Sequence, residues 1–257
     1  MIKPGVAGTD EKHTLKQVTR VNIVLPCYNP PQGWHERVKD FYAFARPRWD
    51  LHFIVVNDGS SNKAVAEDAR AALQPLPFTL LNYDQNKGKG YALRQGVAAA
   101  PEGFILYTDI DMPFTNQSIE NLMEVISSGN CDIAAGFRDK NYYLNNMSAF
   151  RRRLSQYFRW FMKHGLRISM HDTQCGLKAF NKAGKDAFMR TRINRYLFDF
   201  EFIYLALRSG KLTVKGVPVE LQNNITFTRM RTSVLLREGV NLLCVLYRAA
   251  ISRKNNL

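Results

Sequence analysis

Short apolar segments alternate with segments of helical spacing through the first half of the chain. The apolar segments are rich in strand-favouring residues and run into polar turns, which is typical of buried strands. The pattern predicts strands at 21–26, 51–56, 78–81, 103–108 and 132–136, and helices at 34–45, 64–73, 91–100 and 116–127. Pro26 is expected to break the first strand, and Thr115 or Asn116 to cap the last of these helices.

Strands that alternate with helices and are apolar on both faces indicate an α/β fold with a parallel sheet covered on both sides. In such sheets ligands bind outside the carboxyl ends of the strands. Four predicted strands run into polar segments at that end, namely 26–29, 57–60, 86–90 and 109–111. The sequence therefore predicts one binding site where these segments converge.

Asp109 and Asp111 stand where the fourth strand ends. In an extended chain, residues two apart point to the same side, so both carboxylates could reach one ligand. Because two close negative charges repel, a cation between them is favoured. Mg²⁺ or Mn²⁺, bound through oxygen and carrying substrate phosphates, fits this pair. The alternative is that both are solvated turn residues.

A dinucleotide-binding fold is excluded by the glycine spacing. Gly88-Lys-Gly90 is followed by Gly96, too late for the G-x-G-x-x-G pattern, and no GxxxxGK[ST] phosphate loop occurs. Lys87 and Lys89 could still approach a phosphate or a nucleoside, or the segment could be a plain turn.

Positive charge is concentrated in the second half of the chain. Residues 1–136 hold 13 Lys and Arg against 15 Asp and Glu, a balance of −2, and residues 137–257 hold 23 against 7, a balance of +16. Amphipathic segments at 148–164 and 229–254 carry much of it. Such helices can lie at an anionic lipid interface or pack on the core. The apolar stretch 239–247 is too short to span a bilayer.

Two further segments of the second half carry polar residues that could do chemistry. Residues 170–180 crowd short polar side chains ahead of an apolar, strand-like run, and His171 among them is expected to be structural. Asp199 and Glu201 stand among aromatic residues, at the start of an apolar helix expected over 202–207. The two acids could favour the helix dipole, or face the cleft as catalytic or substrate-holding groups.

The chain resembles the family 2 glycosyltransferases of the GT-A fold, and most closely the polyprenyl-phosphate (dolichyl-phosphate) hexosyltransferases. The matching pieces span roughly residues 21–220 and are Val24–Asn29, Ile54–Ser60, Asn86–Gly90, Tyr107–Pro113, Gly136–Arg138, Asp172–Lys178 and Phe198–Glu201. The resemblance implies a mostly parallel, Rossmann-like sheet flanked by helices. It divides the chain into a tail (1–20), a catalytic domain (21–228; nucleotide half 21–136, acceptor half 137–228) and a basic amphipathic helix (229–257).

The resemblance also implies roles for individual residues. Asp109, Asp111, Asp199 and Glu201 are the candidate catalytic residues, and the first two are the candidate metal ligands for Mg²⁺ or Mn²⁺. Pro26, Tyr28, Asn29, Asp58, Lys87 and Lys89 would bind the nucleotide sugar together with Asp109, with Tyr28 stacking on the base and Asp58 accepting from its ring NH. Arg138, Arg151, Asp172 and Gln174 would serve the acceptor. Pro30 and Asn57 depart from the family, which usually has Glu and Asp there.

The implied reaction is inverting transfer of a hexose from a UDP-glucose or GDP-mannose type donor to a polyprenyl phosphate. The expected location is cytoplasmic, peripheral at the cytosolic face of an anionic membrane. The widely spaced cysteines and the lack of a visible signal peptide agree with that location. The alternatives are a family 2 enzyme that extends a saccharide, with Asp199 as base, a nucleotidyltransferase, and a nucleic-acid-binding protein. No nucleic-acid-binding motif is present.

Overall fold

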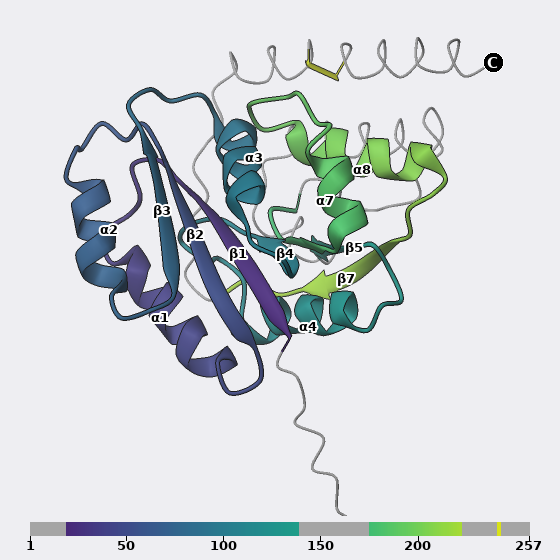
Figure 1. The fold of residues 1–257 in the computed structure, drawn as a ribbon, viewed down its shortest axis with the longest axis horizontal. Coiled ribbons are helices and arrows are strands. Elements are labelled where there is room, and N and C mark those ends of the chain that lie inside the picture. Colours follow the sequence, from purple (N-terminus) through teal and green to yellow (C-terminus); the bar gives the residue numbers. More distant parts are fainter. Residues whose placement is uncertain (1–18, 139–174, 223–240, 243–257) are drawn as a thin grey trace, which may run out of the picture.

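The computed structural model describes residues 19–138, 175–222 and 241–242. In these ranges one sheet runs in the order β3-β2-β1-β4-β6-β5-β7 (Figure 1). The strands are β1 (Arg20–Cys27), β2 (Asp50–Asp58), β3 (Phe78–Tyr83), β4 (Phe104–Tyr107), β5 (Ile133–Arg138), β6 (Lys178–Phe180) and β7 (Val214–Val219). All five strands expected in the first half are present.

The sheet is mostly parallel, as predicted. β1 pairs in parallel with β2 and β4, β2 with β3, and β5 with β7. β6 runs antiparallel between β4 and β5, a reversal that the sequence did not indicate. The carboxyl ends of β1 to β4 therefore lie at one edge of the sheet.

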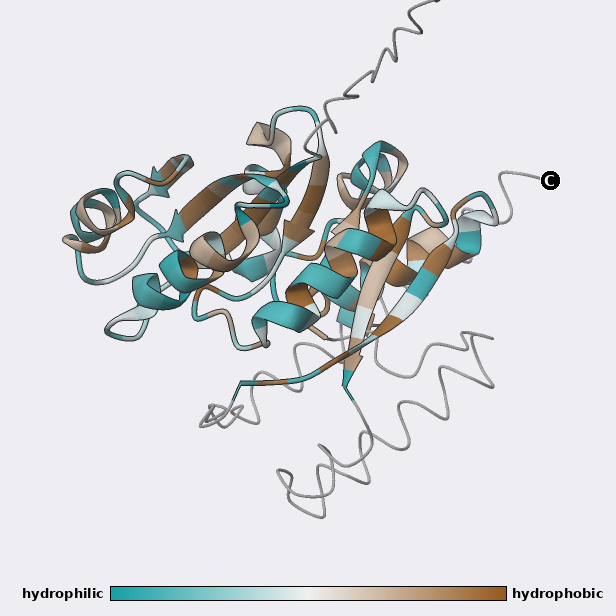
Figure 2. Ribbon diagram, turned by 90° about the horizontal axis from the view of Figure 1, so that it is seen from below, coloured by the Kyte–Doolittle hydropathy of each residue, from teal (hydrophilic) through white to brown (hydrophobic). Residues whose placement is uncertain are grey.

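Helices cover both faces of the sheet and bury two apolar clusters. The helices α1 (Trp34–Ala45), α2 (Val65–Leu73) and α4 (Asn116–Ser127) pack on one face. The helices α3 (Lys89–Ala99), α7 (Lys182–Phe188) and α8 (Phe198–Ser209) lie on the other (Figure 1). Figure 2 shows the hydrophobic strands between helices that are hydrophilic on their outer sides. Burial on both faces explains the continuous apolar runs of the strands.

The expectation that Pro26 breaks the first strand was wrong, because β1 continues through it to Cys27. The carbonyl of Val24 accepts a hydrogen bond from the amide of Thr108, so Val24 faces β4. Pro26, two residues on, faces the same side, but β4 pairs with β1 only as far as Tyr107. The missing N–H of Pro26 therefore breaks no ladder hydrogen bond.

The second half joins the same sheet as the first. β6 and β7 pair with strands of the first half, and the expected boundary between residues 136 and 137 falls inside β5. The apolar helix that was expected over 202–207 begins earlier than predicted. α8 begins at Phe198, which places Asp199 and Glu201 in its first turn. α7 and β7 were not predicted.

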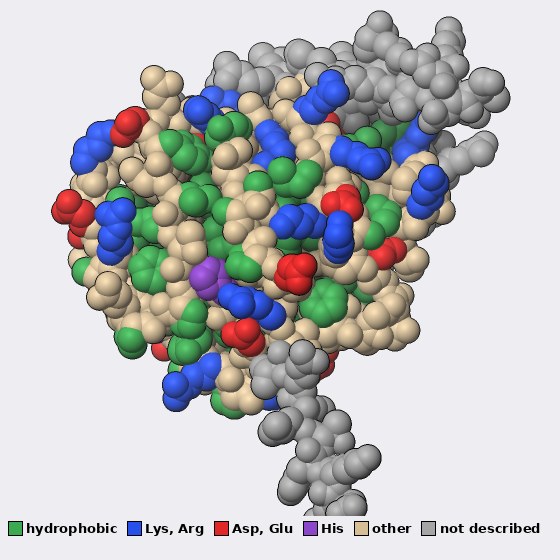
Figure 3. All heavy atoms as spheres, viewed as in Figure 1, with side chains coloured by type: hydrophobic (Ala, Val, Ile, Leu, Met, Phe, Trp, Pro, Cys, Tyr) green, Lys and Arg blue, Asp and Glu red, His purple; other side chains and the backbone are tan. Residues whose placement is uncertain are grey.

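Several sequence expectations fall outside the described residues: the basic segments 148–164 and 229–254, the tail up to residue 18, and the candidate residues Arg151, Asp172 and Gln174. The described residues hold 20 Lys and Arg against 17 Asp and Glu, a balance of +3 of the chain's +14. Both signs are interspersed on the face in Figure 3. No helix in the described part is long and apolar enough to cross a membrane.

Candidate functional site

Asp109 and Asp111 belong to a turn rather than to an extended chain. The amide of Met112 donates to the carbonyl of Asp109 (2.9 Å), and Met112 has a φ of 42°. The extended-chain reasoning was therefore wrong in its geometry. The two carboxylates nevertheless lie near each other. Burial, and then the charge of Asp109, raise the pKa of Asp111 above its usual value.

Lys89 pairs with Asp109 at the centre of the site. Lys89 is the first residue of α3, and its ammonium contacts the Asp109 carboxylate. Burial lowers the pKa of Lys89, but Asp109, Asp199 and, last, Tyr196 outweigh it and raise the pKa above its ordinary value. The ammonium is therefore charged at neutral pH and is directed at the carboxyl end of β4.

Asp58 joins the end of β2 to the turn before α3. Its two carboxylate oxygens accept from the amides of Lys87 and Gly88, each at 2.8 Å, and the residue is buried. Sequence reasoning placed this carboxylate on a base ring NH and did not foresee these backbone contacts. A carboxylate holding two N–H groups fixes the 86–90 turn beside β2.

Asn57 stands where the family usually has Asp, and its contacts explain the amide. Its Nδ2 donates to Oδ1 of Asn82 (2.7 Å), while its own Oδ1 accepts from the hydroxyl of Ser60 (2.6 Å). A carboxylate could accept at both places but could not donate to Asn82. An ionised Asp could replace it only if the Asn82 amide turned over to donate.

The loop after β1 is pinned to the loop after β2. The amide of Asn29 donates to Oγ of Ser60 (2.9 Å), and the Asn29 side-chain oxygen accepts from the amide of Ser61 (2.8 Å). Tyr28 is 49% exposed beside this contact, and Pro26 is buried in β1. The predicted convergence of the polar segments after the first strands is thus present in the structure.

Asp199 lies in a buried polar cluster, of which the sequence analysis named Asp199 but not its partners. Its Oδ1 accepts from the hydroxyl of Tyr107 (2.6 Å) and from Nζ of Lys178 (2.8 Å), and Lys178 also donates to the carbonyl of Cys175 (2.6 Å). Burial, and then Asp199, raise the pKa of Tyr107 well above its usual value. Sequence reasoning missed Lys178 and Tyr107. The sequence signal that could have revealed Lys178 is a lysine at the start of an apolar, strand-like run, where a charged side chain needs a buried partner.

Glu201 binds the loop before α8. Its Oε2 accepts from the amides of Arg192 and Ile193, each at 2.8 Å, and the residue is buried. The arrangement gives this carboxylate a structural contact that neither sequence interpretation had included.

The candidate acceptor residues are only partly described. Arg138 ends β5 and is half-buried. Gly176 follows directly after the segment that contains Asp172 and Gln174, and a Cβ on it would lie 3.1 Å from Oδ2 of Asp109. The chain therefore comes close to Asp109 just after that segment.

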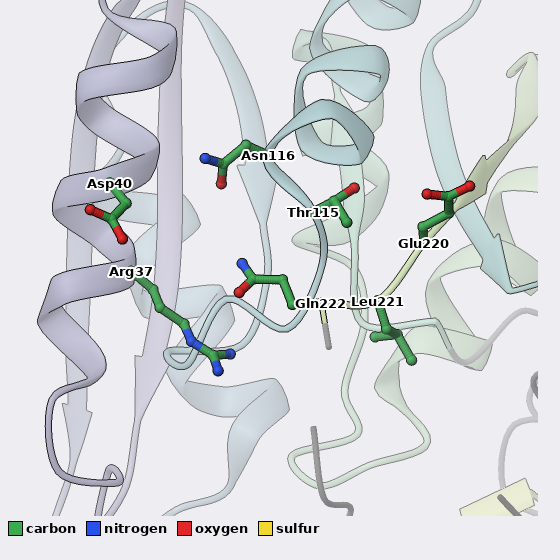
Figure 4. Close-up of a pocket in the computed structure, with 7 residues that line it drawn as sticks. All are labelled: Arg37, Asp40, Thr115, Asn116, Glu220, Leu221 and Gln222. Carbon is green, nitrogen blue, oxygen red and sulfur yellow. The ribbon is translucent and has the colours of Figure 1, made fainter. Parts of the chain in front are cut away.

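A cleft of about 600 Å³ adjoins the Asp109–Met112 turn (Figure 4). Arg37 and Asp40 of α1, Thr115 and Asn116 at the start of α4, and residues 220–222 line it. Nη1 of Arg37 donates to the carbonyl of Asp111 (3.0 Å), and Gln222 donates to the carbonyls of Met112 (3.2 Å) and Phe114 (3.1 Å). The cleft residues thus hold the turn from the α1 side.

The carboxylates present fit a divalent cation that is completed by its substrate. Within the described ranges, no group of three or more His, Cys, Asp or Glu side chains gathers. Mg²⁺ and Mn²⁺ in phosphate-transfer sites often take only one or two carboxylates and complete their shell with substrate oxygens. The half-buried, like-charged pair of Asp109 and Asp111 suits that donor set.

Comparison with known sequences identifies the family. The model of glycosyl transferase family 2 matches residues 22–197. A dolichyl-phosphate beta-glucosyltransferase of Trichomonas vaginalis is 27% identical over 258 residues, covering 90% of this chain and 75% of that protein. The dolichyl-phosphate beta-glucosyltransferase of Drosophila melanogaster is 25% identical over 239 residues, covering 81% and 72%.

Comparison with solved structures identifies the fold as GT-A. The mannosyl-3-phosphoglycerate synthase from Rubrobacter xylanophilus superposes with a TM-score of 0.69 at 16% identity, covering 93% of this chain and 76% of that one. A glucosyl-3-phosphoglycerate synthase from Mycobacterium tuberculosis, in complex with Mn²⁺, UDP and glucosyl-3-phosphoglycerate, superposes with a TM-score of 0.64 at 14% identity, covering 90% and 80%.

Proposed function

The chain belongs to glycosyl transferase family 2, and we propose that it transfers a hexose from a nucleotide diphosphate sugar to the phosphate of a polyprenyl lipid. The observation that carries the proposal is the cluster of Asp109, Asp111 and Lys89 at the carboxyl edge of the sheet. The names of the similar dolichyl-phosphate beta-glucosyltransferases favour UDP-glucose as the donor and the lipid phosphate as the acceptor.

Asp109 and Asp111 are the residues that would hold a divalent ion. When bound there, Mg²⁺ or Mn²⁺ would neutralise the diphosphate leaving group. Lys89 adds a second positive charge on the same carboxylate, directed at the same leaving group. With the ion bound, the site would carry a net positive charge that favours the donor diphosphate.

The nucleoside would lie over the ends of β1 to β3. Tyr28 is exposed there and offers an aromatic face to the base, while Pro26 and Asn29 shape its loop. Asp58 keeps the 86–90 turn in place, and its remaining lone pairs would accept from the base. Lys87, on the same turn, would stand near the nucleotide.

The reaction forms a bond between an acceptor phosphate oxygen and the anomeric carbon. The bond from that carbon to the donor diphosphate breaks, and the nucleoside diphosphate leaves with the bonding electrons. Inversion turns an α-linked donor into a β-linked product. A phosphate acceptor is already an anion at neutral pH, so transfer depends on positioning rather than on a strong base.

The surroundings of Asp199 favour this acceptor over a saccharide hydroxyl. A saccharide acceptor needs a carboxylate to remove its proton. Asp199 is buried and already accepts from Tyr107 and Lys178, which supports a positioning role in place of a base. Glu201 is similarly held by Arg192 and Ile193.

Binding of the acceptor is assigned to residues of the second half, where positive charge is concentrated. Arg138, Arg151, Asp172 and Gln174 are its proposed contacts. Residues outside the described ranges hold 16 Lys and Arg against 5 Asp and Glu, a balance of +11. That charge suits a phosphate headgroup on an anionic surface and a peripheral position at the cytosolic face of a membrane.

The test is transfer from radiolabelled UDP- and GDP-hexoses to a short-chain polyprenyl phosphate, with Mg²⁺, Mn²⁺ or EDTA. We expect metal-dependent labelling of the lipid, and none with Asp111→Ala. Asp186→Ala, which removes an exposed carboxylate of α7, is the matched control and should keep wild-type turnover. Labelling of a saccharide instead of the lipid would refute the acceptor, and full activity of Asp111→Ala would refute the metal site.

A further inference from the structure

The loop of residues 191–197, here called the 191–197 loop, is held by contacts from α3 and from α8. Glu201 accepts from the amide of Ile193 (2.8 Å), and Nη1 of Arg94 donates to the carbonyl of Ile193 (2.8 Å). The carbonyl of Asn194 accepts from the amide of Gly90 (2.8 Å). Most of these partners are buried or half-buried, so the loop has little freedom to move.

The 191–197 loop lies directly on the turn that carries Lys89. A Cβ on Gly88 would lie 2.4 Å from the carbonyl oxygen of Asn194, and one on Gly90 would lie 2.4 Å from that of Ile193. Only glycines allow this approach. The loop and the turn therefore form one packed wall beside the Asp109–Lys89 pair.

Tyr196 is exposed on this wall. It is 49% exposed, although Leu197 next to it is buried. Among the described residues, the exposed large apolar side chains are Tyr28, Tyr196 and Met189. Tyr28 already has a proposed partner in the nucleotide base. Residues on both sides of Tyr196 lie against the turn of Lys89: Cγ of Arg195 would be 3.2 Å from a Cβ on Gly88, and the ring of Phe198 is 6.0 Å from Nζ of Lys89.

We propose that Tyr196 is a sugar-binding residue whose ring packs against the hexose of the donor. The inference rests on the proposed function, because it needs a nucleotide sugar whose diphosphate lies at Lys89 and Asp109. With the base over β1 to β3, the hexose extends from that diphosphate toward β6. The start of α8 packs there, since the ring of Phe198 is 5.9 Å from that of Tyr107, which pairs with Lys178 of β6. Tyr196, two residues earlier, lies beside this position.

The chemistry of the side chain suits a sugar. A tyrosine ring presents an apolar face to the C–H groups of a hexose and a hydroxyl to its polar edge. It also has few rotatable bonds, so ordering it on binding costs little entropy. Because contacts from Arg94 and Glu201 hold the loop, its backbone is positioned before the ligand arrives.

The test compares binding of UDP-glucose and of UDP, each with Mn²⁺, by titration calorimetry, with GDP-mannose and GDP as a second pair. The sugar contact is present only in the nucleotide sugar. We expect Tyr196→Ala to weaken UDP-glucose binding about fivefold to tenfold while UDP binding stays within about twofold. Tyr196→Phe keeps the ring and should restore most of the affinity. Met189→Ala, an exposed apolar side chain of the 188–190 turn, should change neither.

The other outcomes are separable. An equal loss for UDP and UDP-glucose in Tyr196→Ala would place the ring on the nucleotide and overturn the inference, as would no loss for either. A protein that binds as expected but labels no polyprenyl phosphate would refute the proposed acceptor and leave the sugar contact standing. If the wild-type chain binds neither nucleotide pair, both proposals fail.

Discussion

Replacing Lys178 by methionine should destabilise the protein strongly, because its ammonium is the charged partner of a buried carboxylate. The Lys178 and Asp199 side chains are 0% and 6% exposed, and their charged atoms are 2.8 Å apart. The same ammonium donates to the carbonyl of Cys175 (2.6 Å). Methionine fills a similar volume but offers no charge and no donor, so among the described residues Asp199 keeps the hydroxyl of Tyr107 as its side-chain donor.

The magnitude follows from leaving a charge unpaired in the interior. Removing one partner of a buried ion pair costs about 3–5 kcal/mol. Since a domain is stable by only about 5–15 kcal/mol, Lys178→Met should lose a large part of that stability. Adding Asp199→Asn removes the unpaired charge, and we expect the double variant to recover about 1–3 kcal/mol, measured as a coupling between the two sites.

The assay is urea unfolding followed by far-UV circular dichroism. With a slope of about 3 kcal/mol per M, the Lys178→Met midpoint should fall by about 1–2 M. Lys182→Met is the matched control, because that lysine is 88% exposed and its partner in the described part of the chain is Asp186, one turn further along α7. Its midpoint should stay near that of the wild type. A Lys178→Met loss below about 1 kcal/mol, or no recovery in the double variant, would refute the argument.

Two further predictions test the packing of the 191–197 loop on Gly90 and the lowered pKa of His52. Gly90→Ala should destabilise by about 1–3 kcal/mol, seen as a lower unfolding midpoint, because its Cβ would lie 2.4 Å from the carbonyl oxygen of Ile193; an unchanged midpoint would contradict the close packing. Burial, and then Arg20, lower the pKa of His52 below 6.5, so the unfolded chain binds the proton more tightly. The free energy of unfolding should therefore fall as the pH drops below about 6.5. In His52→Gln the free energy of unfolding should depend less on pH in that range, and a slope equal to that of the wild type would count against the lowered pKa of His52.

The two helices that the sequence predicted with their full bounds have strong local signals. The helix at 34–45 buries Trp34, Val38 and Phe41 at helical spacing, and the helix at 116–127 has a Thr115 cap that accepts from the amide of Ser118. Helical spacing and capping depend on neighbours in the chain and can be read from the sequence.

The elements that were missed depend on partners elsewhere in the fold. β7 contains Gly216 and Pro218, which argue against a strand, yet it lies at the edge of the sheet, where such residues are tolerated. α7 has only seven residues and is capped by Asn181, whose side chain accepts from the amide of Gly184. Such a short helix has almost no periodicity to detect.

The candidate site shows the same division between local and distant information. The sequence correctly predicted that the polar segments after β1, β2 and β3 lie close together, because the carboxyl ends of parallel strands share one edge. It could not show that Asp58 holds the amides of Lys87 and Gly88, since those contacts connect residues about thirty positions apart. The pairing of Lys178 with Asp199 is likewise a tertiary contact.

Two pairs of acids with the same spacing end in different chemistry because their backbones differ. Asp109 and Asp111 lie in a turn, and their charges interact. Asp199 and Glu201 lie in the first turn of a helix, where residues two apart point to different sides. Asp199 accordingly meets Lys178, and Glu201 meets the amides before the helix. We therefore expect a shared cation at the first pair and not at the second, so metal-dependent transfer should depend on the turn after β4.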